Sequence, residues 1–277
     1  MIRIVTDSSC DLPSEVVEQH RVSVVPLTIR FGDEEFIDGV ELSADGFWER
    51  VAAAADLPET ATPPAGRFHD VFRSLVSEGA DGIVAICLSS ELSGTVQAAR
   101  LAAENSTAGI PIRVVDSRSV SLGLGMSVVA AAGRSAAGGT IDAVEETARD
   151  AAGRTNLLAV LDTLDHLKRG GRIGGAAALV GEVLKVKPLI TLRDGAVTAA
   201  GRIRTRKRAV GALLDHLAGL PGSIEAAGVI HSGHEEVGRI AEALATMVGE
   251  EPTVARLGPV VGTHAGPGVL GVVYRTR

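Results

Sequence analysis

Aromatic residues, cysteines and long apolar runs are all scarce in this sequence of 277 residues. Phe, Trp and Tyr make up 3% of the chain while 45% of the residues are hydrophobic, so the core must consist mainly of Val, Leu, Ile and Ala. The two cysteines, Cys10 and Cys87, lie far apart, which argues against a disulfide framework and against a zinc site of the usual spacing. No apolar run approaches the length that spans a bilayer.

An excess of positive charge is also absent. The formal net charge of −7 argues against nonspecific binding to nucleic acid or to anionic membranes through bulk charge. The opening residues, Met1–Val5, lead directly into polar residues, which is not the pattern of a signal peptide. We therefore expect a cytoplasmic protein, and nothing in the composition calls for a metal ion or a cofactor.

Short strands and helices alternate over residues 1–153, which we assign to a Rossmann-like N-terminal domain with a parallel sheet. Strands are predicted over Ile2–Val5, Val22–Ile29, Gly82–Leu88 and Ile112–Val115, with a hairpin turn at Gly32-Asp33. Helices are predicted over residues 14–20, 45–54, 66–77 and 95–103. In sheets of this kind, ligands collect at the carboxyl ends of the strands, where polar clusters occur here.

The pattern changes after about Gly153, and we assign residues 154–277 to an α+β C-terminal domain. Helices are predicted over residues 173–184, 207–217 and 235–248. Strands are predicted over residues 157–161, 186–192, 196–203, 226–230, 254–257 and 269–274. The dipeptide Asp194-Gly195 predicts a tight hairpin between two of these strands. The fold class expected for the whole chain is therefore α/β with two domains and a ligand site between them.

The segment Gly262–Gly268 is rich in glycine and lies between two apolar runs. Its glycines leave main-chain N–H groups open to a ligand, and His264 is able to change charge near neutral pH. The alternative is a plain turn between strands with a surface histidine, and the segment alone does not decide between the two.

Two further segments are rich in hydroxyl groups. Ser89–Thr95 follows a buried strand and opens a helix, so its N–H groups and the hydroxyls of Ser93 and Thr95 suit an anion. Ordinary capping of the helix by Ser93 is the alternative. In Thr60–Pro64, the prolines fix an extended path that exposes the threonine hydroxyls, unless the segment is only a rigid loop.

Two basic segments, the glycine-rich Lys168–Gly175 and Arg202–Arg208, stand out in an acidic protein. They suit a phosphate group or an acidic partner surface, although a solvated charged face is the common explanation for a single charge run.

Evidence for catalysis is weak. A Ser93–His264 pair is conceivable as nucleophile and base, but no acidic residue is evident to orient the histidine.

Taken together, these segments resemble the DegV family, whose members include the fatty-acid-binding subunit of bacterial fatty acid kinase. The resemblance extends over essentially the whole chain. It is specific because several motifs occur in the family's order: Ile4–Ser9, Val25–Leu27, Ser90–Thr95, Val115–Ser117, Gly170–Ile173, Leu184–Pro188 and Gly262–Gly268.

The resemblance implies that one long-chain fatty acid lies between the domains, with its carboxyl group at their junction. It implies carboxylate-binding roles for Thr60, Ser93 and His264, with three further residues beside them: Gly94, Thr95 and Thr263. The sequence departs from the family pattern after Thr60, where the family has Ser, Gln, Pro and Ser. Because Ala61, Thr62, Pro63 and Pro64 follow here, Thr62 is an alternative carboxylate ligand.

The function implied by the resemblance is that of a non-catalytic subunit. It would present the fatty acid to a separate ATP-dependent kinase subunit and carry the resulting acyl-phosphate, with transient membrane contact for lipid exchange. Arg172, Arg202 and Arg204 are the expected contacts to the phosphate group or the kinase, in segments too charged for the lining of a lipid pocket. The alternatives are a stand-alone lipid carrier or sensor and a hydrolase using Ser93 and His264.

Overall fold

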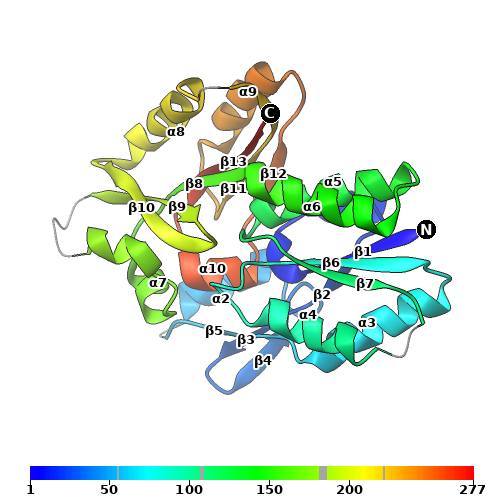
Figure 1. The fold of residues 1–277 in the computed structure, drawn as a ribbon. Coiled ribbons are helices and arrows are strands. Elements are labelled where there is room, and N and C mark those ends of the chain that lie inside the picture. Colours follow the sequence, from blue (N-terminus) through cyan, green and yellow to red (C-terminus); the bar gives the residue numbers. More distant parts are fainter. Residues whose placement is uncertain (55, 107–108, 181–185, 221) are drawn as a thin grey trace.

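The first half of the chain forms a four-stranded parallel sheet, as predicted, and its strand order is β2-β1-β6-β7 (Figure 1). The computed structural model describes all residues except 55, 107–108, 181–185 and 221. The elements of this half are β1 (Ile2–Asp7), η1 (Ser8–Cys10), α1 (Ser14–Gln19), β2 (Ser23–Val25), β3 (Thr28–Phe31), β4 (Glu34–Ile37), α2 (Ala44–Ala53), β5 (Glu59–Ala61), α3 (Ala65–Ser77), β6 (Gly82–Cys87), α4 (Thr95–Glu104), β7 (Ile112–Asp116), α5 (Leu122–Ala136) and α6 (Ile141–Arg154).

Helices cover both faces of this sheet because alternate strand residues point to opposite sides. Ile4 faces α5 and α6, whereas the adjacent Val5 packs with Phe68 and Phe72 of α3. Helix α5 also contacts β8, β11 and β13 of the second sheet, so it lies between the two sheets. The sequence interpretation did not include α5 or α6. The boundary proposed at residue 153 falls at the last turn of α6, and the division into domains stays a proposal.

The predicted strand Val22–Ile29 is wrong, because the segment divides into two strands of different sheets. β2 joins the parallel sheet, while β3 pairs with β4 and β5 in a small antiparallel sheet. Pro26 lies between them and has no N–H to donate to a strand ladder. The next N–H, that of Leu27, is donated to the Ser8 hydroxyl at 3.1 Å. The hairpin predicted at Gly32-Asp33 is confirmed by the pairing of β3 with β4.

The second half forms a six-stranded sheet in the order β10-β9-β8-β13-β11-β12, in which only the β11–β12 pair is parallel among the described strands. Its elements are β8 (Thr155–Val160), α7 (Asp165–Arg169), η2 (Gly174–Leu179), β9 (Lys187–Arg193), β10 (Ala196–Ile203), η3 (Arg206–Arg208), α8 (Ala209–Ala218), β11 (Ile224–His231), α9 (Val237–Val248), β12 (Thr253–Arg256), α10 (Pro259–Ala265) and β13 (Leu270–Thr276). Helices α8 and α9 cover the outer face, which leaves the inner face toward the first half. The predicted hairpin is confirmed, and Asp194 and Gly195 both have positive φ, as its tight turn requires.

Two predictions in this half are wrong, one for the helix over residues 173–184 and one for the glycine-rich segment Gly262–Gly268. The helix expected over residues 173–184 is a 3₁₀ helix over Gly174–Leu179 followed by an extended Val180; residues 181–185 lie outside the described residues. Gly174 has φ +47, and a Cβ there would lie 2.5 Å from the carbonyl oxygen of Val197, so only glycine fits at this position. Residues 181–185 include the first two positions of the Leu184–Pro188 motif.

The glycine-rich segment Gly262–Gly268 is neither an open loop nor a turn between strands, because its first four residues belong to α10. Pro259 occupies the first helical turn, which suits its fixed φ and missing N–H. The N–H groups of Gly262 and Gly266 donate to carbonyls of Gly258 and Gly262 at 2.8 Å. These groups are therefore not available to a ligand. Within the described residues, no helix has the length and apolar content needed to cross a bilayer.

Candidate functional site

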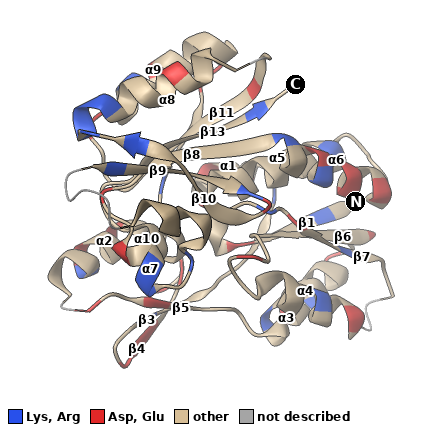
Figure 2. Ribbon diagram, turned by 60° about the vertical axis from the view of Figure 1, so that its left-hand side comes forward, with Lys and Arg blue, Asp and Glu red and all other residues tan. Residues whose placement is uncertain are grey.

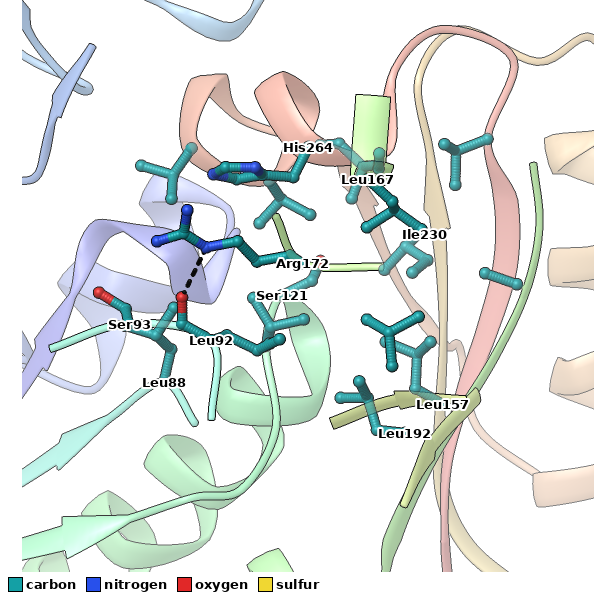
Figure 3. Close-up of a pocket in the computed structure, with 18 of the residues that line it drawn as sticks. Leu88, Leu92, Ser93, Ser121, Leu157, Leu167, Arg172, Leu192, Ile230 and His264 are labelled. Carbon is teal, nitrogen blue, oxygen red and sulfur yellow. Dashed lines mark hydrogen bonds between the residues drawn. The ribbon is translucent and has the colours of Figure 1, made fainter. Parts of the chain in front are cut away.

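A pocket with an empty volume of about 850 Å³ lies between the two halves (Figure 3). The first half contributes residues that follow the carboxyl ends of β6 and β7, among them Leu88, Leu92 and Val120. The second half contributes the inner face of the six-stranded sheet, where Leu157, Ala159 and Leu161 project on the same side. Apolar side chains form most of the wall. The six polar lining residues are Thr60, Thr62, Ser93, Ser121, Arg172 and His264.

Five of these polar residues gather on the side of the pocket away from the sheet face. The Thr60 hydroxyl and His264 Nε2 are 2.9 Å apart, which joins β5 to α10. The Thr62 and Ser93 hydroxyls are 3.2 Å apart, which joins the same segment to the loop before α4. Figure 3 shows His264 and Arg172 side by side with Ser93 next to them, while Leu157, Leu192 and Ile230 lie across the pocket. The pocket therefore has one polar end and one apolar end.

His264 is uncharged at neutral pH. Burial, followed by the neighbouring Arg172 and His166, lowers the pKa of its imidazole to about 4. Its Nδ1 is buried against Gly170 and has no hydrogen-bond partner among the described residues. A proton on Nδ1 would be a buried donor without an acceptor, so the favoured tautomer carries its proton on Nε2 and donates to Thr60. Thr60 then accepts this bond and keeps its own proton to donate into the pocket.

Ser93 stands at the turn from β6 into α4, but it is not the N-cap of the helix, which was the alternative to an anion site. The N-cap is Gly94, and the Ser93 hydroxyl accepts only a long bond of 3.4 Å from the Thr95 N–H. Its closer partners are the hydroxyls of Thr95 at 2.9 Å and of Thr62 at 3.2 Å. These three hydroxyls form a short chain that ends at the pocket wall.

Arg172 lines the pocket, so the expectation that its segment carries too much charge for a lining position is wrong for this residue. Its Nε donates to the Leu92 carbonyl at 3.0 Å and its Nη1 to the Gly170 carbonyl at 2.6 Å. These two acceptors hold the guanidinium beside His264. The charge itself is not neutralised by a carbonyl, which leaves the polar end suited to an anion.

A second cavity, with an empty volume of about 1010 Å³, adjoins the polar end from outside. It shares Thr60, Arg172 and His264 with the first pocket. Further polar residues in its wall are Asp56, Glu59, His166, Arg169 and Thr263. We call this cavity the vestibule. The vestibule and the polar end of the pocket therefore border the same three side chains.

The other predicted residues lie away from the pocket. The Thr263 hydroxyl donates to the Pro259 carbonyl inside α10 at 2.8 Å. Arg202 and Arg204 are exposed where β10 leads towards α8, a basic region visible in Figure 2. Arg202 donates to the Ala178 carbonyl at 3.4 Å. The basic segment thus lies outside both the pocket and the vestibule.

The hydrolase alternative receives no support from this geometry. Ser93 hydrogen-bonds to Thr62 and Thr95, and His264 hydrogen-bonds to Thr60, so the two are not paired as nucleophile and base.

Ser121 lines the pocket but was not predicted from the sequence. The signal available for it was its position just after β7, where a polar residue follows the carboxyl end of a parallel strand.

Comparisons with known proteins agree with this architecture. A model of the DegV family, described as a family of uncharacterised proteins, matches residues 1–277. A DegV domain-containing protein of Streptomyces coelicolor is 37% identical, over 100% of this chain and 99% of that protein. A Thermus thermophilus structure described as fatty acid binding of a DegV family protein has 35% identity and a TM-score of 0.91, covering 100% and 99% of the two chains. A Bacillus subtilis DegV structure, described as a fatty acid binding protein, has 32% identity and a TM-score of 0.88 at the same coverage.

Proposed function

This chain belongs to the DegV family, and we propose that it binds one long-chain fatty acid in the pocket between its two halves. The carboxyl group would lie at the polar end and the acyl chain against the face of the six-stranded sheet. The observation that carries the proposal is the distribution of polarity: an apolar pocket with hydroxyl, imidazole and guanidinium groups at one end. The fatty-acid-binding descriptions of the Thermus and Bacillus relatives support it.

The polar end offers the donors that a buried carboxylate needs. Taking a carboxylate out of water is unfavourable unless several donors replace the lost hydrogen bonds. Thr60 is oriented as a donor by His264, and Ser93 supplies a second hydroxyl. Arg172 adds a positive charge within the same wall. Thr62 is bonded to Ser93 and remains the alternative ligand.

We further propose that the protein presents this carboxylate to a separate ATP-dependent kinase subunit. The carboxylate oxygen would attack the γ-phosphorus of ATP held by that subunit, and ADP would leave. The position of the vestibule beside the polar end supports the proposal, because a phosphoryl group arriving there would meet Arg172 and Arg169. Arg202 and Arg204 would contact the kinase surface outside the vestibule. The protein would then carry the acyl-phosphate, with transient membrane contact for lipid exchange.

Mass spectrometry of lipid extracted from the purified protein tests the first step. We expect one long-chain fatty acid per chain, and native mass spectrometry should show uptake of palmitate or oleate by delipidated protein. Protein that stays unliganded in excess palmitate and oleate would contradict the proposal. Purification from its own cells separates a kinase subunit from a stand-alone carrier, since only the former would retain an ATP-dependent partner.

A further inference from the structure

A third cavity, separate from the fatty-acid pocket and the vestibule, lies beside η1 and the start of α1. Its empty volume is about 710 Å³, and it shares no lining residue with the other two. The polar lining residues include Ser8, Asp11, Ser14 and Asp38. Among the described residues that line it, none is Lys, Arg or His. We call this cavity the Asp38 pocket.

Asp38 is the buried acidic group of this cavity. Its side chain lies in a residue that is only 5% exposed, and its Oδ2 has no hydrogen-bond partner among the described residues. Burial raises the pKa of Asp38 to about 7; the Ser8 hydroxyl opposes this rise, and the Asp7 carboxylate adds to it. A buried carboxylate oxygen without a partner is unfavourable, and a positive group would stabilise its charged form.

The other titratable groups that face Asp38 are Asp7, Cys10 and Asp11, and none brings a positive charge. Both oxygens of Asp11 already accept hydrogen bonds, from Gly258 N–H at 2.9 Å and from the Ser121 hydroxyl at 2.5 Å. Asp7 is likewise occupied by the N–H groups of Ser9 and Leu88. Asp38 therefore has the free acceptor of the cluster.

The remaining walls are apolar, which restricts the kind of cation that fits. Leu12, Val17, Val24 and Pro26 line the cavity, and Val40 stands near its opening with 75% of its surface exposed. A divalent metal ion prefers a shell of oxygens, whereas an organic cation places its charge on a carboxylate and its carbon stem on apolar walls.

We propose that the Asp38 pocket binds an alkylguanidinium or alkylammonium group, with the charge beside the Asp38 carboxylate and the stem against Leu12, Val24 and Val40. A free amine and a basic side chain of a partner protein share this chemistry. Binding is accompanied by loss of a proton at neutral pH, because the cation favours the ionised form of Asp38.

Isothermal titration of n-butylguanidinium chloride at pH 7 tests the site. Wild-type protein binds it, with a heat that varies with the ionisation enthalpy of the buffer as a proton is released. Asp38→Asn weakens binding by roughly tenfold or more, as expected when a charge-assisted hydrogen bond is lost. The matched control, Asp33→Asn, removes an exposed aspartate from the β3–β4 turn and leaves binding unchanged. Palmitate binding by Asp38→Asn confirms that the variant is folded.

A second variant keeps the proposal testable if Asp38→Asn does not fold. Val40→Ser alters an exposed side chain and weakens binding of n-butylguanidinium more than binding of guanidinium itself, which has no stem. A titration with the amide-capped peptide Ala-Arg-Ala distinguishes the sources: binding assigns the site to a partner's side chain, and its absence assigns it to a free cation. The proposal is overturned if neither cation binds, if Asp38→Asn binds as tightly as wild type, or if only Mg²⁺ binds.

Discussion

The two halves of the molecule enter the pocket in different ways. The parallel sheet presents an edge, so the loops after β6 and β7 bring short polar side chains to the site. The six-stranded sheet presents a face, so β8, β9 and β11 bring a regular array of aliphatic side chains. The edge of a sheet brings a few polar groups to one place, whereas the face of a sheet provides a broad apolar surface. The acyl chain is proposed to lie on this face, whereas the proposed carboxylate end combines Ser93 of the first half with Arg172 and His264 of the second.

The largest effect on palmitate affinity is expected from a larger side chain on the pocket-facing side of the six-stranded sheet. Ala159 lies between Leu157 and Leu161 on the pocket side of β8, and a phenyl ring there would take the place of part of the acyl chain. Excluding about four methylene groups would weaken palmitate binding by ~3 kcal/mol, or roughly a hundredfold. Titration of Ala159→Phe with palmitate and octanoate measures this effect. An unchanged palmitate affinity would mean that the acyl chain does not lie on this face.

A smaller loss of palmitate affinity is expected from substitutions at the polar end of the pocket. Ser93→Ala removes one hydrogen bond to a charged group, which should weaken palmitate binding by about 1.5–3 kcal/mol. Thr60→Ala should act similarly, and Thr62→Ala should matter less. Ser90→Ala is the matched control, since that hydroxyl is bonded to Asp116 outside the pocket. If Thr62→Ala is the most harmful variant, Thr62 and not Thr60 is the ligand.

The protonation state of His264, at the polar end of the pocket, can be tested through the pH dependence of stability. Because its folded-state pKa is lowered to about 4, the unfolded chain binds more protons than the folded protein between pH 4 and 6.5. The contribution of neutral His264 to stability is therefore present above pH 6.5 and is lost as the pH falls towards 4. Thermal unfolding of wild type and His264→Gln should give a difference in Tm that changes with pH in this window. His69→Gln, on α3, provides the comparison. A constant difference would show that His264 is not held in its neutral form.

The smallest effect on lipid affinity is expected outside both regions. Arg204→Glu reverses an exposed charge beyond β10, so palmitate affinity should change by less than about 0.5 kcal/mol. Phosphorylation of the bound fatty acid by the kinase should fall, and the wild-type rate should be the more sensitive to salt. Arg73→Glu, on the exposed side of α3, serves as the charge-matched control. A loss of lipid affinity with normal kinase coupling would place Arg204 in the pocket instead.

Only part of the polar end was predictable from strand positions, because Thr60 lies within β5, Arg172 follows α7 and His264 belongs to α10. Ser93 and Thr95 come directly after β6, and the carboxyl ends of parallel strands share one edge. The apolar sheet face of the pocket was not predictable from the sequence, since Leu157, Ala159 and Ile230 have the pattern of ordinary core residues. Only the empty space beside them distinguishes them. Site roles assigned from the family resemblance, including those of Thr60 and Thr62, stay predictions until binding is measured.

The errors in the fold have local physical causes. α10 was missed because the three glycines and two prolines of residues 259–268 are typical of a turn, whereas here packing on Trp48 stabilises a short helix. The strand across Pro26 was wrong because two β-branched runs appear continuous when the proline's missing N–H is ignored. The helix over residues 173–184 failed at Gly174, whose contact with β10 is not visible from local sequence.

The glycines around α10 have a consequence for how the sequence can change. A Cβ at Gly262 would lie 2.6 Å from the Phe47 ring, and one at Gly266 would lie 2.6 Å from the ring of His166. A Cβ at Gly170 would overlap His264 itself. Each position is therefore constrained by a side chain from a distant segment, so replacements there should be strongly epistatic. Gly266 also has φ +76, which disfavours any other residue whatever the space, whereas a larger residue at position 262 becomes tolerable only after positions 47 and 48 have become smaller.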